Sequence, residues 1–222
     1  MYNTEVGYTQ SINFVMGFFL IINGGSDEEA FWMFTAISNR NHNYGNVENF
    51  DGGFSEFYWD NFPLYCQFVY QFDKLMERRL PKLKAHFDKL GFHSDIYLQN
   101  WFMTIFNWFP MSLWIRIWDN LLVQGLVYMF KFPLAIMECL QDQLLENDIE
   151  GVNDIIMGLR NIDFKNKDWP IPSIEKLSIK LSSVALTMEE LMELKKEYDE
   201  NVGAKKKMKE IKRLPTLFDD KG

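Results

Sequence analysis

The chain has 222 residues, of which 47% are hydrophobic and 16% aromatic, and its formal net charge at pH 7 is -8. This hydrophobic content suffices for the core of one large domain or two small ones, and it excludes a largely disordered chain. The acidic balance disfavours a nucleic-acid-binding protein, because such proteins are usually basic.

Cysteine content and targeting signals give expectations about the compartment. Cys66 and Cys139 are the only cysteines, which predicts no disulfide framework and a reducing environment. Met1 precedes polar residues rather than a secretory leader, and the longest apolar run, 14–22, is shorter than the roughly 20 residues that span a bilayer. We therefore expect a cytoplasmic protein without a transmembrane segment, either peripheral to membranes or part of a large intracellular assembly.

The spacing of apolar residues predicts an all-α fold, because helical periods recur and alternation of period two is scarce. The first helix is expected from Glu5 to Ile22 and should be buried, since it is apolar nearly all round. Asn23-Gly24-Gly25 should end it. Ser26 and Glu29 form a capping box that should open a helix ending near residue 39.

Residues 40–57 are rich in Asn and Gly and are expected to form a long surface loop. Pro81 fits the first turn of a helix that Gly91 closes. Further helices are expected after residue 60 through about 79, and over 81–91, 95–108, 110–125, 127–145, 148–159, 174–183 and 187–202. The basic run 205–213 is interpreted as a solvated helix end or mobile tail rather than as a membrane-surface patch.

The composition predicts three parts of the chain. Residues 1–160 should form one helical domain. Residues 161–173, with Pro170 and Pro172 around Trp169, are typical of an extended linker or strap. Residues 174–222 should form a helical, charged carboxy-terminal extension.

Gln10 stands at the head of the first apolar helix, after Gly7 and Tyr8. Its amide can donate and accept hydrogen bonds, so it could orient a water molecule or a phosphate oxygen. A Gln in this place can also cap neighbouring backbone groups, and the local sequence alone favours this second interpretation.

Known catalytic motifs are absent from the sequence. It contains no Gly-rich phosphate loop, no His-Glu-x-x-His and no nucleophile elbow, so we expect neither a metal nor a cofactor. His86 and His93 are more typical of packed, hydrogen-bonded residues than of ligands. Arg116 resembles a buried cation and is expected to form an ion pair with Asp119 on the same helix.

Three segments together resemble the TBC domain, the all-helical module that accelerates GTP hydrolysis on Rab-family small GTPases. Val6-Gly7-Tyr8-Thr9-Gln10-Ser11-Ile12-Asn13 resembles the family's Tyr-x-Gln motif. Leu80-Pro81-Lys82-Leu83-Lys84-Ala85-His86-Phe87 is similar to its Pro-x-Leu-x-x-His-Phe segment. Residues 101–125, with Trp101, Pro110 and Arg116-Ile117-Trp118-Asp119, follow the pattern of a third segment. Order and spacing agree with the family from residue 2 to about 160.

The resemblance implies a multi-helix TBC-type fold and a GTP-bound Rab-family GTPase as partner. It implies that Gln10 is a glutamine finger, which orients the attacking water in the partner's site. Tyr8, Thr9, Ser11 and Asn13 would contact the partner. The residues with implied structural roles are Pro81, His86, Trp101, Arg116, Trp118 and Asp119.

The sequence departs from the family pattern at two points. The family's arginine finger belongs to an Ile-x-x-Asp-x-x-Arg motif upstream of Tyr-x-Gln, and the 222 residues contain no such motif. We therefore expect a TBC domain that is incomplete at its amino-terminal end. An arginine finger is worth roughly 10³ to 10⁵ in rate, so little activity is expected without one. Ser11 replaces the Gly that commonly follows the glutamine.

Three hypotheses follow. The chain is part of a working Rab GTPase activator, in which the hydrolytic site belongs to the GTPase and the chain itself is no enzyme. Alternatively, it is a catalytically inactive TBC-derived scaffold whose obligate partner covers an apolar face with Phe14, Phe18, Phe19 and Phe31. The third hypothesis, a helical enzyme that uses His86 or His93, ranks last because no paired acid, base or nucleophile accompanies either residue.

Overall fold

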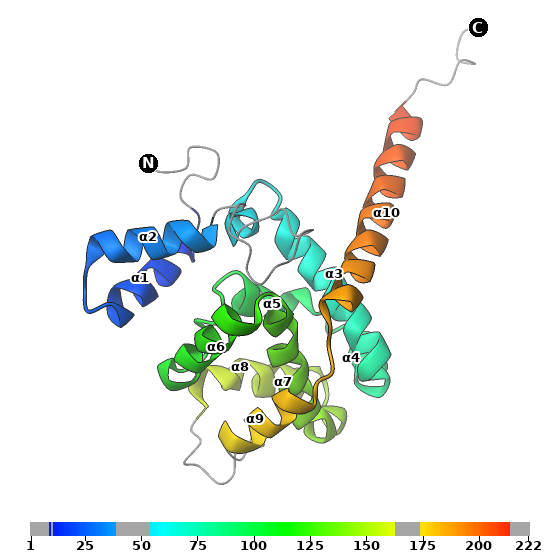
Figure 1. Ribbon diagram of the computed structural model, residues 1–222. Helices are drawn as coiled ribbons and strands as arrows, with labels where there is room; N and C mark the ends of the chain where they lie inside the picture. The colour runs from blue at the N-terminus through cyan, green and yellow to red at the C-terminus, as the bar shows by residue number, and fades with distance from the viewer. Residues whose placement is uncertain (1–8, 10, 39–53, 163–173, 214–222) are drawn as a thin grey trace, which may run out of the picture.

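The computed structural model describes residue 9 and residues 11–38, 54–162 and 174–213 (Figure 1). These residues form helices and contain no strand, which confirms the predicted all-α class. In chain order the helices are α1 (Ile12–Ile22), α2 (Asp27–Ser38), the 3-10 helix η1 (Phe54–Tyr58), α3 (Pro63–Arg79), α4 (Pro81–Leu90), α5 (Asp95–Phe102), α6 (Met111–Gln124), α7 (Val127–Leu145), α8 (Ile149–Gly158), η2 (Leu159–Asn161), α9 (Ile174–Ser183) and α10 (Met188–Arg213).

The first helix differs from its prediction in start and in burial. It begins at Ile12, because Thr9 is not helical and Ser11 has a φ of 92° that a right-handed helix cannot include. The predicted part before Thr9 lies outside the described residues. Only one side of α1 is buried, through Val15, Phe18 and Phe19, so the prediction of burial all round was wrong.

Side-chain oxygens cap three later helix starts, and the sequence predicted the cap at Ser26. The Oγ of Ser26 accepts a hydrogen bond of 3.3 Å from the Glu29 N–H at the start of α2. The Asp148 carboxylate accepts one of 3.0 Å from the Gly151 N–H at the start of α8. The Oγ1 of Thr187 accepts a hydrogen bond of 3.3 Å from the Glu190 N–H at the start of α10. Each bond satisfies an N–H that the first helical turn leaves without a partner.

Two predicted segments need correction. The helix expected over 95–108 ends at Phe102, because Ile105 (φ 46°) and Phe106 (φ 63°) adopt left-handed conformations. The end of the loop expected over 40–57 is the 3-10 helix η1, whose Tyr58 is buried and donates a 2.9 Å hydrogen bond to the Met103 carbonyl. Burial therefore raises the pKa of the Tyr58 phenol well above its ordinary value. Residues 39–53 of that loop lie outside the described residues.

Helix α7 forms the centre of the core. It is buried on nearly all sides despite an internal proline, Pro133. The Phe130 ring packs against Phe68 of α3 and Phe102 of α5, at centroid distances of 4.7 and 5.9 Å. The Phe132 ring meets Phe106 edge-on at 5.1 Å. Such aromatic pairs add to the large burial of apolar area that drives folding.

The carboxy-terminal helices pack on the rest of the molecule. α9 lies against α7 and buries Leu177, while α10 lies against α3 and buries Leu191 and Leu194. The backbone of α10 remains helical to Arg213, so the predicted end near residue 202 was too early, and the distal part of the helix projects from the body (Figure 1). The divisions at residues 160 and 173 stay predictions, and 163–173 lie outside the described residues.

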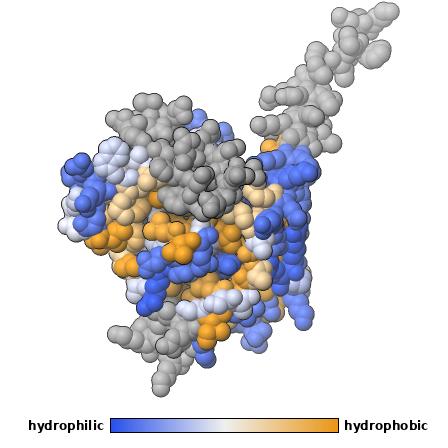
Figure 2. Space-filling model, viewed as in Figure 1, coloured by the Kyte–Doolittle hydropathy of each residue, from blue (hydrophilic) through white to orange (hydrophobic). Residues whose placement is uncertain are grey.

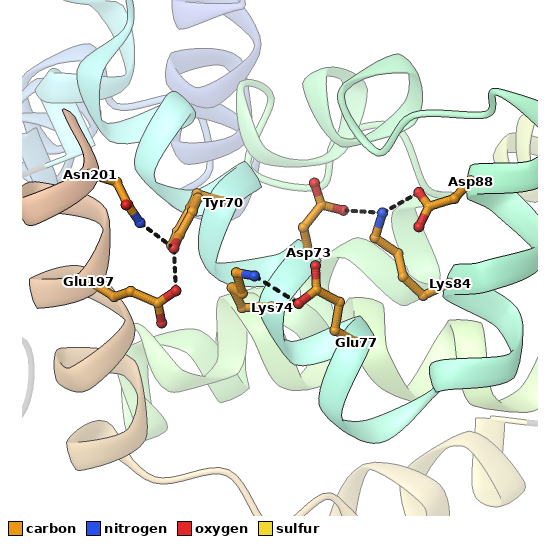
Figure 3. A network of polar contacts seen from close by, with 8 residues as sticks. All are labelled: Tyr70, Asp73, Lys74, Glu77, Lys84, Asp88, Glu197 and Asn201. Atoms are coloured by element: carbon orange, nitrogen blue, oxygen red, sulfur yellow. Dashed lines mark hydrogen bonds and ion pairs between the residues drawn. The ribbon is translucent and has the colours of Figure 1, made fainter. Parts of the chain in front are cut away.

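A group of polar contacts holds α10 on α3, and we call it the polar clamp. Its side chains are those of Tyr70, Gln71, Arg79, Glu190 and Glu197. The Arg79 guanidinium donates to the Glu190 carboxylate at 2.5 Å and to the Ala185 carbonyl at 2.7 Å. The Gln71 amide donates to the Leu191 carbonyl at 2.8 Å. Further along, the Tyr70 hydroxyl donates to Glu197, as Figure 3 shows. Charge-assisted bonds such as those of Arg79 are the stronger kind.

A second polar group on α3 faces α4. Asp73 accepts a 2.6 Å hydrogen bond from the Ser94 hydroxyl. It also lies 3.8 Å from the Lys84 amine, which pairs with Asp88 as well, as Figure 3 shows. Burial raises the pKa of the Asp73 carboxyl, although the Ser94 hydrogen bond and the Lys84 charge act in the opposite direction. The start of α4 is thus tied to α3 by charge as well as by apolar packing.

The two arginines at the end of α3 provide a matched test of the polar clamp. Arg79→Met should lower the free energy of unfolding by about 2 kcal/mol, because Glu190 and the Ala185 carbonyl lose a charged donor. Arg78→Met should change it by less than about 0.5 kcal/mol, since Arg78 is more exposed and lies 3.6 Å from the same carboxylate. Urea denaturation of the whole chain measures both. Equal effects of the two substitutions would refute the clamp.

Candidate functional site

The candidate site is the segment that leads into α1. Thr9 is half-buried, Ser11 is buried and Asn13 is exposed on the first turn of the helix. Tyr8 and Gln10 lie outside the described residues, so the roles that the resemblance gives them stay predictions. The segment and α1 carry no charged side chain among the described residues 9 and 11–22. Any polar chemistry at this site therefore depends on amide, hydroxyl and backbone groups.

A tight turn precedes α1. The Ile12 N–H donates a 3.3 Å hydrogen bond to the Thr9 carbonyl, and Ser11 has φ 92° and ψ -25°. These angles are close to those of the third residue of a type II turn, a position that normally requires Gly. Ser11 therefore holds a backbone conformation that costs a residue with a Cβ roughly 1 kcal/mol or more. The carbonyl of Ser11 accepts bonds from the N–H groups of Phe14 and Val15, which start the helix.

Aromatic contacts hold α1 on α6. The Phe18 ring lies 4.4 Å from Trp114 and stacks on Trp118 at 5.0 Å between centroids. The Phe19 ring meets Trp118 edge-on at 5.2 Å. The Trp114 indole in turn donates a 2.9 Å hydrogen bond to the Ile105 carbonyl. These contacts fix the position of the helix that follows the candidate site, and we call them the aromatic dock.

Trp114 is central to the aromatic dock, although it is not among the residues predicted to have a structural role. Its position four residues before Trp118 on a helix was a usable signal, because residues at that spacing share a face. The left-handed backbone at Ile105, which orients the carbonyl that Trp114 contacts, had no comparable signal in a non-glycine residue.

Other residues with implied structural roles are placed in the core or at helix junctions. Trp101 and Trp118 are buried. Pro81 is the first residue of α4, where its fixed φ suits a helix start. The Nε2 atom of His86 lies 2.9 Å from the Asn147 carbonyl oxygen and so joins α4 to the end of α7.

Arg116 and Asp119 require a correction. Both are exposed, and no ion pair joins them in the described part of the chain. The reason is the face that α6 buries, which runs through Leu113, Ile117 and Leu121 and leaves Arg116 turned to solvent. Apolar neighbours along the sequence therefore do not show that Arg116 itself is buried.

The predicted open aromatic face also differs in part from the structure. Phe18 and Phe19 are buried in the aromatic dock, whereas Phe14 is 45% exposed. Other large apolar residues are exposed on α1, α2 and α6, namely Ile21, Ile22, Trp32, Met111, Ile115, Leu122 and Val123. In Figure 2, hydrophobic residues show on the surface beside α1, whereas the right-hand edge, where the start of α10 and α4 lie, is hydrophilic. Exposed apolar area of this kind is typical of interaction surfaces.

The described part of the chain offers no obvious place for a metal or a membrane span. Among those residues, no group of three or more His, Cys, Asp and Glu side chains could hold a metal ion. None of the helices there combines the length and the hydropathy needed to cross a bilayer.

Comparison with known proteins identifies the family. The Rab-GTPase-TBC domain matches residues 1–145, which is well over half of the chain and ends with α7. This chain therefore belongs to the Rab-GTPase-TBC domain family, as the three sequence segments predicted. Helices α8, α9 and α10 lie beyond the matched residues.

Similar proteins from animals and fungi include named GTPase-activating proteins. The chain is 33% identical over 149 residues to the human ecotropic viral integration site 5 protein homolog, an alignment that covers 67% of this chain and 17% of that protein. It is 30% identical over 167 residues to GTPase-activating protein GYP5 of Eremothecium gossypii, covering 74% of this chain and 19% of that protein. It is 29% identical over 153 residues to Rab GTPase-activating protein eat-17 of Caenorhabditis elegans, covering 68% of this chain and 16% of that protein. The alignments thus span less than a fifth of each relative.

The aromatic dock predicts a large effect of one substitution on α1. Phe18→Ala should lower the free energy of unfolding by about 3 to 5 kcal/mol, because it leaves a cavity between Trp114 and Trp118. Phe14→Ala on the same helix is the matched control and should cost about 1 kcal/mol, since Phe14 is already 45% exposed. Chemical denaturation followed by tryptophan fluorescence measures both. A small effect of Phe18→Ala would contradict the dock.

The strained turn at Ser11 predicts a substitution that raises the free energy of unfolding. Ser11→Gly should raise the free energy of unfolding by about 1 kcal/mol, because Gly adopts a φ of 92° without steric cost. Ser11→Ala keeps the Cβ and should give no such gain. Thermal unfolding of the two variants beside the original chain distinguishes them. A gain in both, or in neither, would show that Ser11 does not carry this strain.

Proposed function

We propose that this chain regulates a Rab-family small GTPase by stimulating its hydrolysis of GTP, and that Gln10 acts as the glutamine finger. The observation that carries the proposal is the Tyr8-Thr9-Gln10 motif at the head of α1, inside the residues that match the Rab-GTPase-TBC domain. Relatives named as GTPase-activating proteins support the same activity. The hydrolytic site belongs to the GTPase, so the chain would act as its activator.

The chemistry of Gln10 follows from its side chain. The carbonyl oxygen of the amide can accept a hydrogen bond from the attacking water, and the amide nitrogen can donate one to a phosphate oxygen. Phosphoryl transfer depends mainly on such positioning and on stabilisation of charge. Tyr8, Thr9, Ser11 and Asn13 would contact the surface of the partner around this group.

The residues on either side of Gln10 support this role. Thr9 accepts a hydrogen bond from Ile12, and Ser11 directly precedes the helix that the aromatic dock holds on α6. A glutamine between two held residues loses less conformational entropy when it orders at the transition state. The strained backbone of Ser11 fits this view, since such strain is often found at functional sites.

The proposal assigns only the glutamine role to this chain. No Ile-x-x-Asp-x-x-Arg motif occurs in the 222 residues, so no residue here is given the role of the arginine finger. The arginine finger stabilises the charge of the transferring phosphoryl group and is worth roughly 10³ to 10⁵ in rate. The 222-residue chain alone should therefore stimulate hydrolysis only weakly, while still binding the GTP-bound GTPase.

A second function is a TBC-derived scaffold without catalytic activity. The exposed apolar residues of α1 and α2 favour it, with Ile21 62% and Trp32 60% exposed. A partner that covers them would gain about 25 cal/mol for each Å² of apolar surface removed from water. This function predicts association with a protein partner that does not depend on Gln10 or on the nucleotide.

Replacement of Gln10 tests the first proposal. Single-turnover GTP hydrolysis is measured for a panel of Rab GTPases, with the original chain, with Gln10→Ala and with Gln143→Ala as a matched control on the exposed end of α7. We expect the stimulated part of the rate to fall about tenfold or more with Gln10→Ala and to stay unchanged with Gln143→Ala. Circular dichroism verifies that both variants are folded.

Binding data collected with the same proteins separate the two functions. Stimulation that depends on Gln10 supports the activator. Binding that is equal for the GTP-bound and GDP-bound forms, with no stimulation, would contradict the activator and support the scaffold. Absence of both binding and stimulation across the panel would contradict the proposal that a Rab GTPase is the partner.

A further inference from the structure

A cavity of about 310 Å³ lies between α6, α7 and α9. Its inner wall is apolar and includes the buried residues Leu113, Ile117 and Leu177. Its rim is polar and carries charged and hydroxyl groups from all three helices. α9 follows the residues that match the Rab-GTPase-TBC domain, so the cavity forms where this helix meets the matched part.

Two cations on the rim have no ion-pair partner among the described residues. Arg116 comes from α6 and Lys131 from α7, and neither belongs to any ion pair in that part of the structure. By contrast, Lys180 on the neighbouring helix α9 pairs with Glu138 at 2.5 Å. Among the described residues that line the cavity, Asp119 is the single acid, so their summed charge is positive in a chain with a net charge of -8.

Hydroxyl groups complete the rim on the side of α9. Ser178 and Ser182 both line the cavity. The Ser182 hydroxyl donates a 2.9 Å hydrogen bond to the Ser178 carbonyl, which leaves its oxygen lone pairs as acceptors. The Ser178 hydroxyl has no hydrogen bond within the described residues, so its donor is available to a ligand.

We propose that this cavity binds a phosphate monoester or free phosphate, held between Arg116 and Lys131. An arginine guanidinium can donate two parallel hydrogen bonds to phosphate oxygens, while a lysine amine supplies a compact charge. The Ser178 hydroxyl would donate to a third oxygen. This binding site is separate from the segment before α1, so the proposal goes beyond the regulation of a GTPase.

The number of donors favours a phosphate over a carboxylate. Arg116, Lys131 and the Ser178 hydroxyl can together engage three oxygens, which a phosphate offers and a carboxylate, with two, does not. A phosphate monoester also carries about -1.5 to -2 charges at pH 7, so it is attracted more strongly than a carboxylate to a rim with a net positive charge. Asp119 weakens the attraction for any anion, because like charges repel across a small distance. Removal of its charge should therefore strengthen binding.

Isothermal titration of the whole chain with inorganic phosphate and with glycerol phosphate, at constant ionic strength, tests the proposal. We expect at least one of them to bind at concentrations up to about 10 mM. Arg116→Gln and Lys131→Gln should each weaken binding about tenfold, whereas Asp119→Asn should strengthen it about threefold. Arg78→Gln is the matched control, because it removes an exposed cation outside the cavity.

The two ligands also distinguish the source of the phosphate group. Tighter binding of glycerol phosphate assigns the cavity to a phosphate monoester, and tighter binding of inorganic phosphate assigns it to the free anion. Failure of both to bind would overturn the proposal, as would equal weakening by Arg116→Gln and Arg78→Gln. No GTPase is present in this titration, so its result is independent of the function proposed above.

Discussion

The packing of α1 on α6 is the contact on which the candidate site depends. Phe18 lies against both Trp114 and Trp118, and Phe19 meets Trp118 edge-on. Without this aromatic dock, the short helix α1 would keep only α2 as a firm neighbour, and an isolated pair of short helices is marginally stable in water. The dock thus links the segment around Gln10 to the central helices. The hydrogen bond from the Trp114 indole to the Ile105 carbonyl extends this link to the residues that follow α5.

The far side of the molecule is held together differently. There the polar clamp joins α10 to α3, and its central arginine, Arg79, contacts both the α9–α10 connection and Glu190. Apolar burial of Leu191 and Leu194 accompanies these bonds. Helix α9 lies beyond the residues that match the family, and it packs on α7 to enclose the cavity beside Arg116. An added helix can in this way create a cavity that the matched helices lack on their own.

The sequence predicted the features that local chemistry controls. Ser26 caps α2 as expected, because a side-chain oxygen at that position satisfies a free N–H, and Asp148 and Thr187 cap later helices in the same way. It failed where tertiary packing decides. Ile105 and Phe106 adopt left-handed conformations that their side chains disfavour, and α5 ends earlier as a result. Arg116 was expected in the core because its neighbours are apolar, yet it faces solvent. For the candidate site, the motif and its family were predictable, whereas the turn at Ser11 and the role of Trp114 were not.

In the function proposed here, the turn before α1, positioned by the aromatic dock, contacts the GTP-bound form of a Rab GTPase. Hydrogen–deuterium exchange of this chain, with and without a Rab GTPase that it binds, tests this contact. The GTPase is loaded with a non-hydrolysable GTP analogue in one sample and with GDP in the other. We expect exchange to slow in peptides covering residues 6–16 with the GTP analogue and to stay unchanged with GDP. Slowed exchange elsewhere, with these peptides unaffected by either form, would contradict it.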